Sequence, residues 1–283
     1  MTLAKRGVSW AQNYVGRCML RGVGGFKKQE KCGLEWLNKA VAQNHPPAIY
    51  YLATSYGDGM APVLRKSEEK AKQLLMKSAN LGFALANSNS LLAQSFFCGS
   101  RGFEKDQDEA YFRASVAFAL DDTNQEVAEV LGRLHYFRPG IPKPSPYIAC
   151  YYLNIAANED KNGTACYFCS NELVDLSKHL LHSQDRIPGF NVMPSAFFWL
   201  RKSRDMGYSK ARKVLKEWES VGQSRCANCS KEAKTGEKFK QCSKCKAQWY
   251  CSKECQVEAW KAGHKKDCKR ATILKFEDYL NAE

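Results

Sequence analysis

Seven cysteines and one histidine near the C-terminus constrain this 283-residue chain more than any other feature. They fall in four close pairs, which are Cys226 with Cys229, Cys242 with Cys245, Cys251 with Cys255, and His264 with Cys268. Thiolate and imidazole are ligands that zinc prefers, and a two-residue gap lets one tight turn aim both sulfurs at one ion. Eight such ligands complete two tetrahedral sites and leave no position for water or substrate, so the sequence predicts two structural zinc ions.

Disulfide bonds are the alternative interpretation of such a cysteine cluster. They suit small secreted domains, whereas this sequence shows no leader with an apolar core before small residues. We therefore expect a reducing compartment, either the cytoplasm or the nucleus. The cluster holds few apolar residues besides Trp249, Tyr250 and Trp260. Zinc is then expected to supply most of its folding free energy, on the order of 10 kcal/mol per ion.

The ligand order over residues 226–268 resembles the MYND-type zinc finger. Tyr250 stands directly before the fifth ligand, and the sixth begins the run Cys255-Gln256-Val257-Glu258-Ala259-Trp260. The histidine is seventh in the series, whereas RING and PHD fingers place it in the middle. Spacing alone leaves open which ligands share an ion. The resemblance implies one site of Cys226, Cys229, Cys251 and Cys255, and a second site of Cys242, Cys245, His264 and Cys268.

The same resemblance implies a peptide-binding role. MYND-type fingers bind short peptides of the Pro-x-Leu-x-Pro kind along a strand edge, a mode in which backbone pairing gives affinity. The positions that match the family's contact residues are Ser243, Gln256 and Trp260. Gln256 and Trp260 share one face of a helix because they are four residues apart. The alternative is that Trp260 only packs the small core, although one ring can do both.

Residues 1–219 contain a repeated pair, a large residue followed by a small one. It occurs as Val15-Gly16, Leu52-Ala53, Leu92-Ala93, Leu131-Gly132 and Cys169-Ser170, at intervals of 37, 40, 39 and 38 residues. A second column of bulky residues consists of Trp36, Leu74, Phe112, Tyr151 and Trp199. Glycine-rich turns separate the two columns. We predict units of helix, turn and helix, in which the small residue lets the helices approach closely and stacking buries a continuous core.

This pattern resembles the SEL-one-like repeat, a relative of the tetratricopeptide repeat. The second unit carries it best, with Leu52-Ala53-x2-Tyr56-x2-Gly59 and a second helix from Lys70 to Gly82. Two stretches depart from it, the proline-rich segment 138–146 and an insertion over 177–194 that we expect to be a surface loop. The predicted fold class is all-α, a superhelix of αα-hairpin repeats with a small two-zinc finger at its end.

The predicted domain organisation follows from these two features. Residues 1–219 form about five helix pairs and a terminal helix, residues 220–225 form a linker, residues 226–268 form the finger, and residues 269–283 form a helical tail. A third zinc site at Cys166, Cys169, His179 and His182 is considered but not favoured. Cys169 stands in the column of Leu52 and Leu92, so we expect it to pack in the core.

Charge and missing motifs limit the possible functions. The formal net charge is +14, which could attract nucleic acid non-specifically, although zinc-bound thiolates offset part of it. No phosphate-binding loop, nucleophile elbow or dinucleotide fingerprint is present, and no run of about 18 apolar residues could span a membrane. We therefore expect a zinc-binding protein–protein interaction adaptor and not an enzyme, with one protein partner on the concave face of the repeats and a proline-containing peptide at the finger. A nucleic-acid-associated regulator is the first alternative, and a relative of SET-type lysine methyltransferases is the second.

Overall fold

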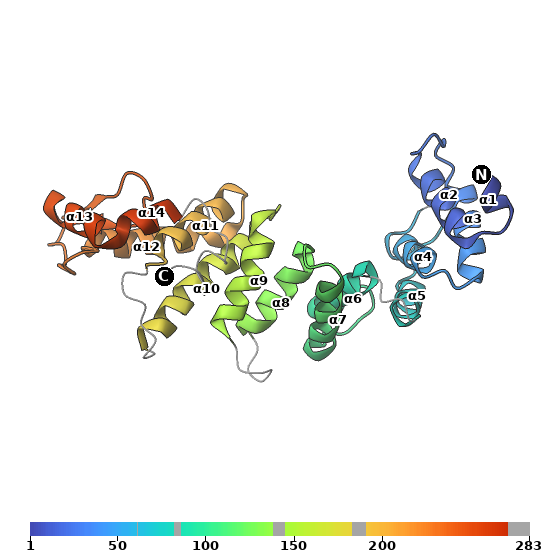
Figure 1. The fold of residues 1–283 in the computed structure, drawn as a ribbon, viewed down its shortest axis with the longest axis horizontal. Coiled ribbons are helices and arrows are strands. Elements are labelled where there is room, and N and C mark those ends of the chain that lie inside the picture. The colour runs from blue at the N-terminus through green and yellow to red at the C-terminus, as the bar shows by residue number, and fades with distance from the viewer. Residues whose placement is uncertain (61, 82–85, 138–144, 183–190, 271–283) are drawn as a thin grey trace. The chain divides into compact units, whose positions relative to one another are not determined.

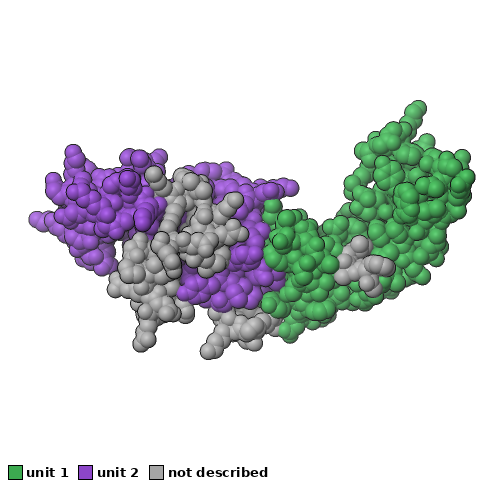
Figure 2. All heavy atoms as spheres, in the orientation of Figure 1, with its two compact units in different colours: residues 1–130 green, residues 131–283 purple. Residues whose placement is uncertain are grey.

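The computed structural model describes residues 1–60, 62–81, 86–137, 145–182 and 191–270. Helices dominate this described part of the chain, which confirms the all-α prediction (Figure 1). Two compact units, residues 1–130 and 131–283, are drawn in different colours in Figure 2. The boundary between them falls within α8 (Gln125–Phe137). None of the described helices is both long and apolar enough to cross a bilayer.

The described residues of unit 1 form a short first helix, three helix pairs and the first part of α8. The first helix is α1 (Thr2–Lys5), and the pairs are α2 (Ser9–Arg21) with α3 (Glu30–Ala42), α4 (Pro46–Asp58) with α5 (Glu68–Asn80), and α6 (Ala86–Cys98) with α7 (Gln107–Leu120). Local residues define the ends of these helices. Gly22 ends α2 at φ 69°, a conformation that costs glycine little, while Asp106 accepts N–H bonds from the first turn of α7.

The first predicted column forms the contact between paired helices. Its five large members are all buried, namely Val15, Leu52, Leu92, Leu131 and Cys169. Close approach is visible at Gly16, where an added Cβ would lie 2.9 Å from both the carbonyl oxygen of Gly33 and Cγ of Leu37. Gly132 is similar, since a Cβ there would lie 2.6 Å from Cγ of Leu153. Gly16 and Gly132 therefore let neighbouring helices approach closely, as predicted.

The second predicted column is wrong in phase in the third and fourth pairs. Phe112 is 54% exposed and Tyr151 is 38% exposed, although both were expected in the core. Ala114 and Leu153, two residues later, are fully buried instead. Each residue turns an α-helix by about 100°, so a register error of one or two residues moves a side chain from the core to the surface.

Unit 2 contains the remaining helix pairs and the cysteine-rich segment. After the end of α8 come α9 (Pro146–Asn158), α10 (Thr164–His182), α11 (Met193–Asp205) and α12 (Ser209–Ser224). The cysteine-rich segment contains β1 (Lys240–Gln241), β2 (Trp249–Tyr250), α13 (Lys253–Ala259), a π-helical turn η1 (Trp260–His264) and α14 (Lys265–Arg270). The two strands are antiparallel, with Lys240 opposite Tyr250. Helix α14 packs against α11.

Four predicted segments differ from the sequence-based expectations or lie wholly or partly outside the described residues. Helix α10 continues through His182, so the predicted insertion over 177–194 begins as helix. Helix α12 continues to Ser224 and so includes most of the predicted linker. Residues 183–190, residues 138–144 of the proline-rich segment, and residues 271–283 of the predicted helical tail are outside the described part.

Candidate metal centre

The first metal group consists of four thiols from three places in the chain. They come from the turn after α12, the end of β2 and the first turn of α13, and they are Cys226, Cys229, Cys251 and Cys255. The ligand atoms all lie within 4.8 Å of one another. Sγ of Cys251 is 3.6 Å from Sγ of Cys229 and 3.6 Å from Sγ of Cys255. In a tetrahedron with Zn–S bonds of about 2.3 Å the sulfurs are roughly 3.8 Å apart, so this group fits one zinc ion.

The second group is the more buried of the two. It consists of Cys242, Cys245, His264 and Cys268, whose ligand atoms again lie within 4.8 Å of one another. Nε2 of His264 is 3.4 Å from Sγ of Cys242 and 3.7 Å from Sγ of Cys245. The π-helical turn η1 carries the histidine into this group, and Gly263 at φ 144° allows the bend. This group also fits one zinc ion.

The two Cys-x2-Cys pairs are held by the same kind of backbone turn. The N–H of Ser230 donates to the carbonyl of Cys226 at 3.0 Å, and the N–H of Lys246 donates to the carbonyl of Cys242 at 3.0 Å. Ser230 and Lys246 both have positive φ, at 59° and 51°. The five residues of each turn, 226–230 and 242–246, therefore bring two sulfurs to the same metal group.

The backbone favours thiolate at Cys226, whereas the pKa of Cys251 in the same group is raised to about 12, by desolvation first and then by the neighbouring thiols. Burial opposes ionisation of Cys226, but backbone N–H groups of Cys229, Cys251 and Asn228 donate to its sulfur and lower the pKa of the thiol to about 6. Zinc binds the thiolate form, so part of the cost of deprotonation is met by the fold itself.

All eight residues predicted as ligands lie in these two groups. The grouping is interleaved along the chain, as the MYND resemblance implies: the first and third pairs share one site, and the second and fourth share the other. The third candidate site is different. Cys166 and Cys169 are buried on α10, which is continuous, so His179 lies ten residues or about 15 Å beyond Cys169 along the axis. One ion cannot bridge that distance.

The predicted peptide-contact residues lie on the finger surface beside the zinc groups. Ser243 is exposed and directly follows Cys242, while Gln256 is half-buried on α13 and directly follows Cys255. Trp260 is half-buried, with its ring centroid 5.8 Å from that of His264 in an edge-on arrangement. Nζ of Lys244 lies 5.4 Å from the Trp260 ring centroid. The ring thus packs on the zinc site and remains partly open to solvent.

The finger and the last helix pair share one apolar core, which the sequence did not reveal. Its members include Phe197 and Leu200 of α11, Leu215 of α12, and Trp249 and Tyr250 of β2. The Trp249 ring centroid lies 5.6 Å from that of Phe197.

Two residues on the repeat side secure this junction. At Gly222 of α12, an added Cβ would lie only 2.3 Å from two ring carbons of Trp249, so the indole packs directly on the helix backbone. Arg201 of α11 donates to the carbonyls of Cys245, at 3.0 Å, and Lys246, and it pairs with Glu219 at 3.3 Å. Gly222 lies within α12, whereas the sequence predicts a linker over residues 220–225.

Family comparisons agree with this geometry. The MYND finger model matches residues 226–268, and the Sel1 repeat model matches residues 11–45, 46–83, 128–161 and 175–208. The chain carries Sel1 repeats followed by a MYND finger. Between the second and third matched repeats lies the α6–α7 pair, which has the same helix–turn–helix form. Two structural zinc ions are consistent with the two ligand groups of this MYND finger.

Solved structures show the same repeat fold. A Sel1 repeat protein from Oxalobacter formigenes superposes with a TM-score of 0.56 at 23% identity, covering 76% of this chain and 78% of that one. The protective antigen c5321 of uropathogenic Escherichia coli strains, which displays an SLR fold, superposes with a TM-score of 0.54 at 15% identity. The match covers 95% of this chain and 56% of that one. A SET and MYND domain-containing protein of Dictyostelium discoideum is 45% identical over 60 residues, 20% of this chain and 11% of that protein.

Proposed function

We propose that this protein is a non-catalytic adaptor, in which the MYND finger binds a proline-containing peptide and the Sel1 repeats bind a second protein. Both modules are typical protein-interaction modules, which supports the general role. The observation that carries the finer proposal is the position of Trp260, which is anchored on a zinc ligand and still partly open to solvent.

Zinc would have a structural role at both sites. Each group offers four protein ligands, which suffice for a closed tetrahedral site. Bound zinc would then hold the backbone beside each ligand in a fixed position. Ser243 and Gln256 are each one residue from a ligand, and Trp260 contacts another, so the peptide-contact residues depend on an intact metal centre. Zinc-binding thiols must be reduced, and we propose that the protein works in the cytoplasm or the nucleus.

The finger also offers a short strand edge. Lys240 and Gln241 of β1 are exposed, and within the described residues this strand pairs with β2 alone. An extended peptide could add its backbone to such an edge, with side chains placed in neighbouring pockets. A proline ring would stack on the open face of Trp260, since aromatic rings combine a flat apolar surface with low rotamer entropy.

Calorimetric titration with a synthetic Pro-x-Leu-x-Pro peptide tests this proposal. We expect zinc-loaded protein to bind the peptide, and we expect Trp260→Ala to weaken binding by at least about tenfold, since loss of a central aromatic contact typically costs 2 kcal/mol or more. The matched control is Trp10→Ala, because Trp10 lies on α2 in the other unit and is 56% exposed.

Zinc content of both variants decides how the result is interpreted. Two zinc ions bound to Trp260→Ala with lost peptide affinity would support a direct contact. Lost zinc would show that Trp260 is a structural residue of the finger. Equal affinity in wild type and Trp260→Ala would contradict the proposed binding site.

A further inference from the structure

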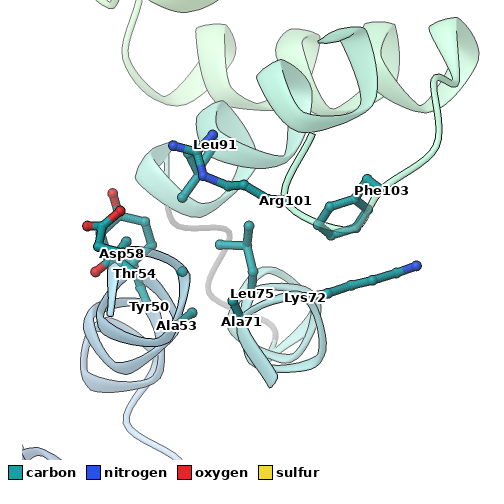
Figure 3. Close-up of a pocket in the computed structure, with 11 residues that line it drawn as sticks. Tyr50, Ala53, Thr54, Asp58, Ala71, Lys72, Leu75, Leu91, Arg101 and Phe103 are labelled. Atoms are coloured by element: carbon teal, nitrogen blue, oxygen red, sulfur yellow. The ribbon is translucent and has the colours of Figure 1, made fainter. Parts of the chain in front are cut away.

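A small pocket lies within unit 1, between the second and third helix pairs (Figure 3). Its volume is about 180 Å³. Apolar side chains from α4, α5, α6 and the turn after α6 line it, namely Ala53, Ala71, Leu75, Leu91 and Phe103. Sites for cofactors and drug-sized ligands usually have roughly 300–1,000 Å³, so this pocket suits a single amino-acid side chain better than a cofactor.

The lining of the pocket includes polar residues and two cations, Lys72 and Arg101. Arg101 reaches from the turn toward α4, where Tyr50, Thr54 and Asp58 lie, while Lys72 points away from the pocket (Figure 3). Nζ of Lys72 is already engaged, since it donates to the carbonyl of Gly102 at 3.2 Å. Within the described part of the chain, Arg101 has no hydrogen bond or ion pair.

The backbone of Arg101 is held in an unusual conformation. Its φ is 54°, in the left-handed region that arginine seldom adopts. Two backbone hydrogen bonds of 3.0 Å hold the surrounding turn. The N–H of Phe103 donates to the carbonyl of Ser100, and the N–H of Ser100 donates to the carbonyl of Ser95. Such conformations cost of order 1–3 kcal/mol and are concentrated at binding sites. The other described non-glycine residues with positive φ are Ser230 and Lys246 in the metal-binding turns and Asn44 between α3 and α4.

The charge balance favours an acidic ligand. Burial raises the pKa of the Tyr50 hydroxyl, so this group is a neutral hydrogen-bond donor at neutral pH. Among the lining residues Asp58 is the one carboxylate, against the two cations Lys72 and Arg101, and it forms no ion pair with Arg101. The chain as a whole has a formal net charge of +14, which attracts acidic partners. A carboxylate can accept two parallel hydrogen bonds from a guanidinium, which is the strongest pairing open to Arg101.

We propose that this pocket receives one apolar side chain of a partner protein, and that an acidic residue next to that side chain in the partner pairs with Arg101. The partner segment would therefore contain a leucine-sized apolar residue beside glutamate or aspartate. This inference rests on the proposed function of the repeats in protein binding and specifies the site and the ligand chemistry.

An array of synthetic 12-residue peptides in a glycine–serine background provides the test. One set contains a Leu-Glu pair, and two matched sets contain Leu-Lys or Ser-Glu at the same position. Binding is measured with the full-length, zinc-loaded protein. We expect retention of the Leu-Glu set to exceed that of either matched set by about tenfold, because each matched set lacks one of the two contacts.

Two variants locate the binding on the pocket. Arg101→Asn removes the charge and keeps a residue that tolerates positive φ, and Arg65→Asn makes the same charge change at an exposed residue outside the pocket. Gly57→Leu fills the pocket from α4, where an added Cβ would meet only Cβ of Ala71 at 3.8 Å. We expect Arg101→Asn and Gly57→Leu to lose about tenfold in retention and Arg65→Asn to bind like wild type.

Several outcomes would overturn the proposal. Equal losses in Arg101→Asn and Arg65→Asn would show unspecific charge attraction, and undiminished binding by Gly57→Leu would place the peptide elsewhere. Retention of none of the three peptide sets would also overturn it. The finger is tested separately with the proline-containing peptide. The proposal for the pocket can therefore be refuted while the proposal for the finger holds, and the reverse.

Discussion

Gly222 is the residue on which the junction between the last helix pair and the finger depends most directly. A Cβ at this position would lie 2.3 Å from Cε3 and Cζ3 of Trp249, far inside contact distance. We expect Gly222→Ala to lower the free energy of unfolding of unit 2 by about 1–3 kcal/mol, the usual cost of overpacking. Urea denaturation followed by tryptophan fluorescence measures this change.

Gly57 provides the control for that substitution. It is also within a helix, but an added Cβ would meet only Ala71, at 3.8 Å. Gly57→Ala should therefore be neutral or should stabilise the protein by about 0.5–1 kcal/mol, because alanine is the better helix former. If Gly222→Ala were tolerated as well as Gly57→Ala, the described packing of Trp249 on α12 would be incorrect.

Glu172 gives a prediction for pH dependence. Its side chain is 3% exposed on α10, and its Oε2 has no hydrogen-bond partner among the described residues. Burial, followed by the negative charge of Asp175, raises the pKa of this carboxyl from 4.5 to about 8. The folded state keeps the proton while the unfolded state loses it above pH 4.5. The raised pKa of Glu172 therefore costs the folded state nothing below pH 4.5, and the free energy of unfolding falls as the pH rises from 4.5 to 8.

Glu172→Gln should remove this dependence. We expect the variant to gain stability relative to wild type as the pH increases from 5 to 8, with an upper limit of about 1.4 kcal/mol per unit of pKa shift. Scanning calorimetry of both proteins across this range measures the difference, and zinc binding affects both alike. Glu35→Gln, at an exposed residue, should show no such trend. A constant difference between Glu172→Gln and wild type would contradict the prediction.

Residue identity predicted the metal ligands but not the residues that fix the finger to the repeats. Cysteine and histidine pairs at short spacing are a local signal, because each turn brings two ligands together by itself. Arg201 and Gly222 act on Cys245 and Trp249, partners 44 and 27 residues away in the sequence. Nothing in their own neighbourhood indicates those partners.

At the scale of helices, the sequence predicted which helices form and how they pair better than it predicted which face of each helix is buried. The large–small column was correct because glycine or alanine is required where two helices touch, as at Gly16 and Gly132. The second column failed at Phe112 and Tyr151, where bulky residues border the core without entering it. In the third pair Arg113 is buried next to Ala114, and it donates to Glu109 at 2.7 Å and to Asn89 at 3.3 Å. A polar residue in the core gives no hydrophobic signal.

Helix α12 should respond to the loss of zinc. Its residues Leu215 and Gly222 pack in the same core as Trp249 and the ligand Cys226, so collapse of the finger removes part of the surface that covers α12. We expect a chelator to increase hydrogen exchange of backbone amides in residues 209–224 as well as in residues 226–268. Helices α2 and α3 in unit 1 serve as the control and should not change. Full protection of α12 after chelation would show that the repeats do not depend on the finger.

The whole molecule combines a helical repeat array, stabilised by packing of neighbours, with a MYND finger that carries two zinc-ligand groups. Both parts were predictable because each has a periodic or spaced signature in the sequence. Their shared core in unit 2 was not predictable, since α11, α12 and β2 meet only in the folded chain. This shared core couples the finger to the last helix pair of the repeats.

Native mass spectrometry of the full chain tests most directly the claim that two ions close this finger. The account predicts a mass increase equal to two zinc ions per chain, one for each ligand group. It also predicts that Cys226→Ser and Cys268→Ser, which alter different groups, each bind at most one ion tightly. A wild-type chain that carries fewer than two zinc ions and keeps a folded finger would contradict the account.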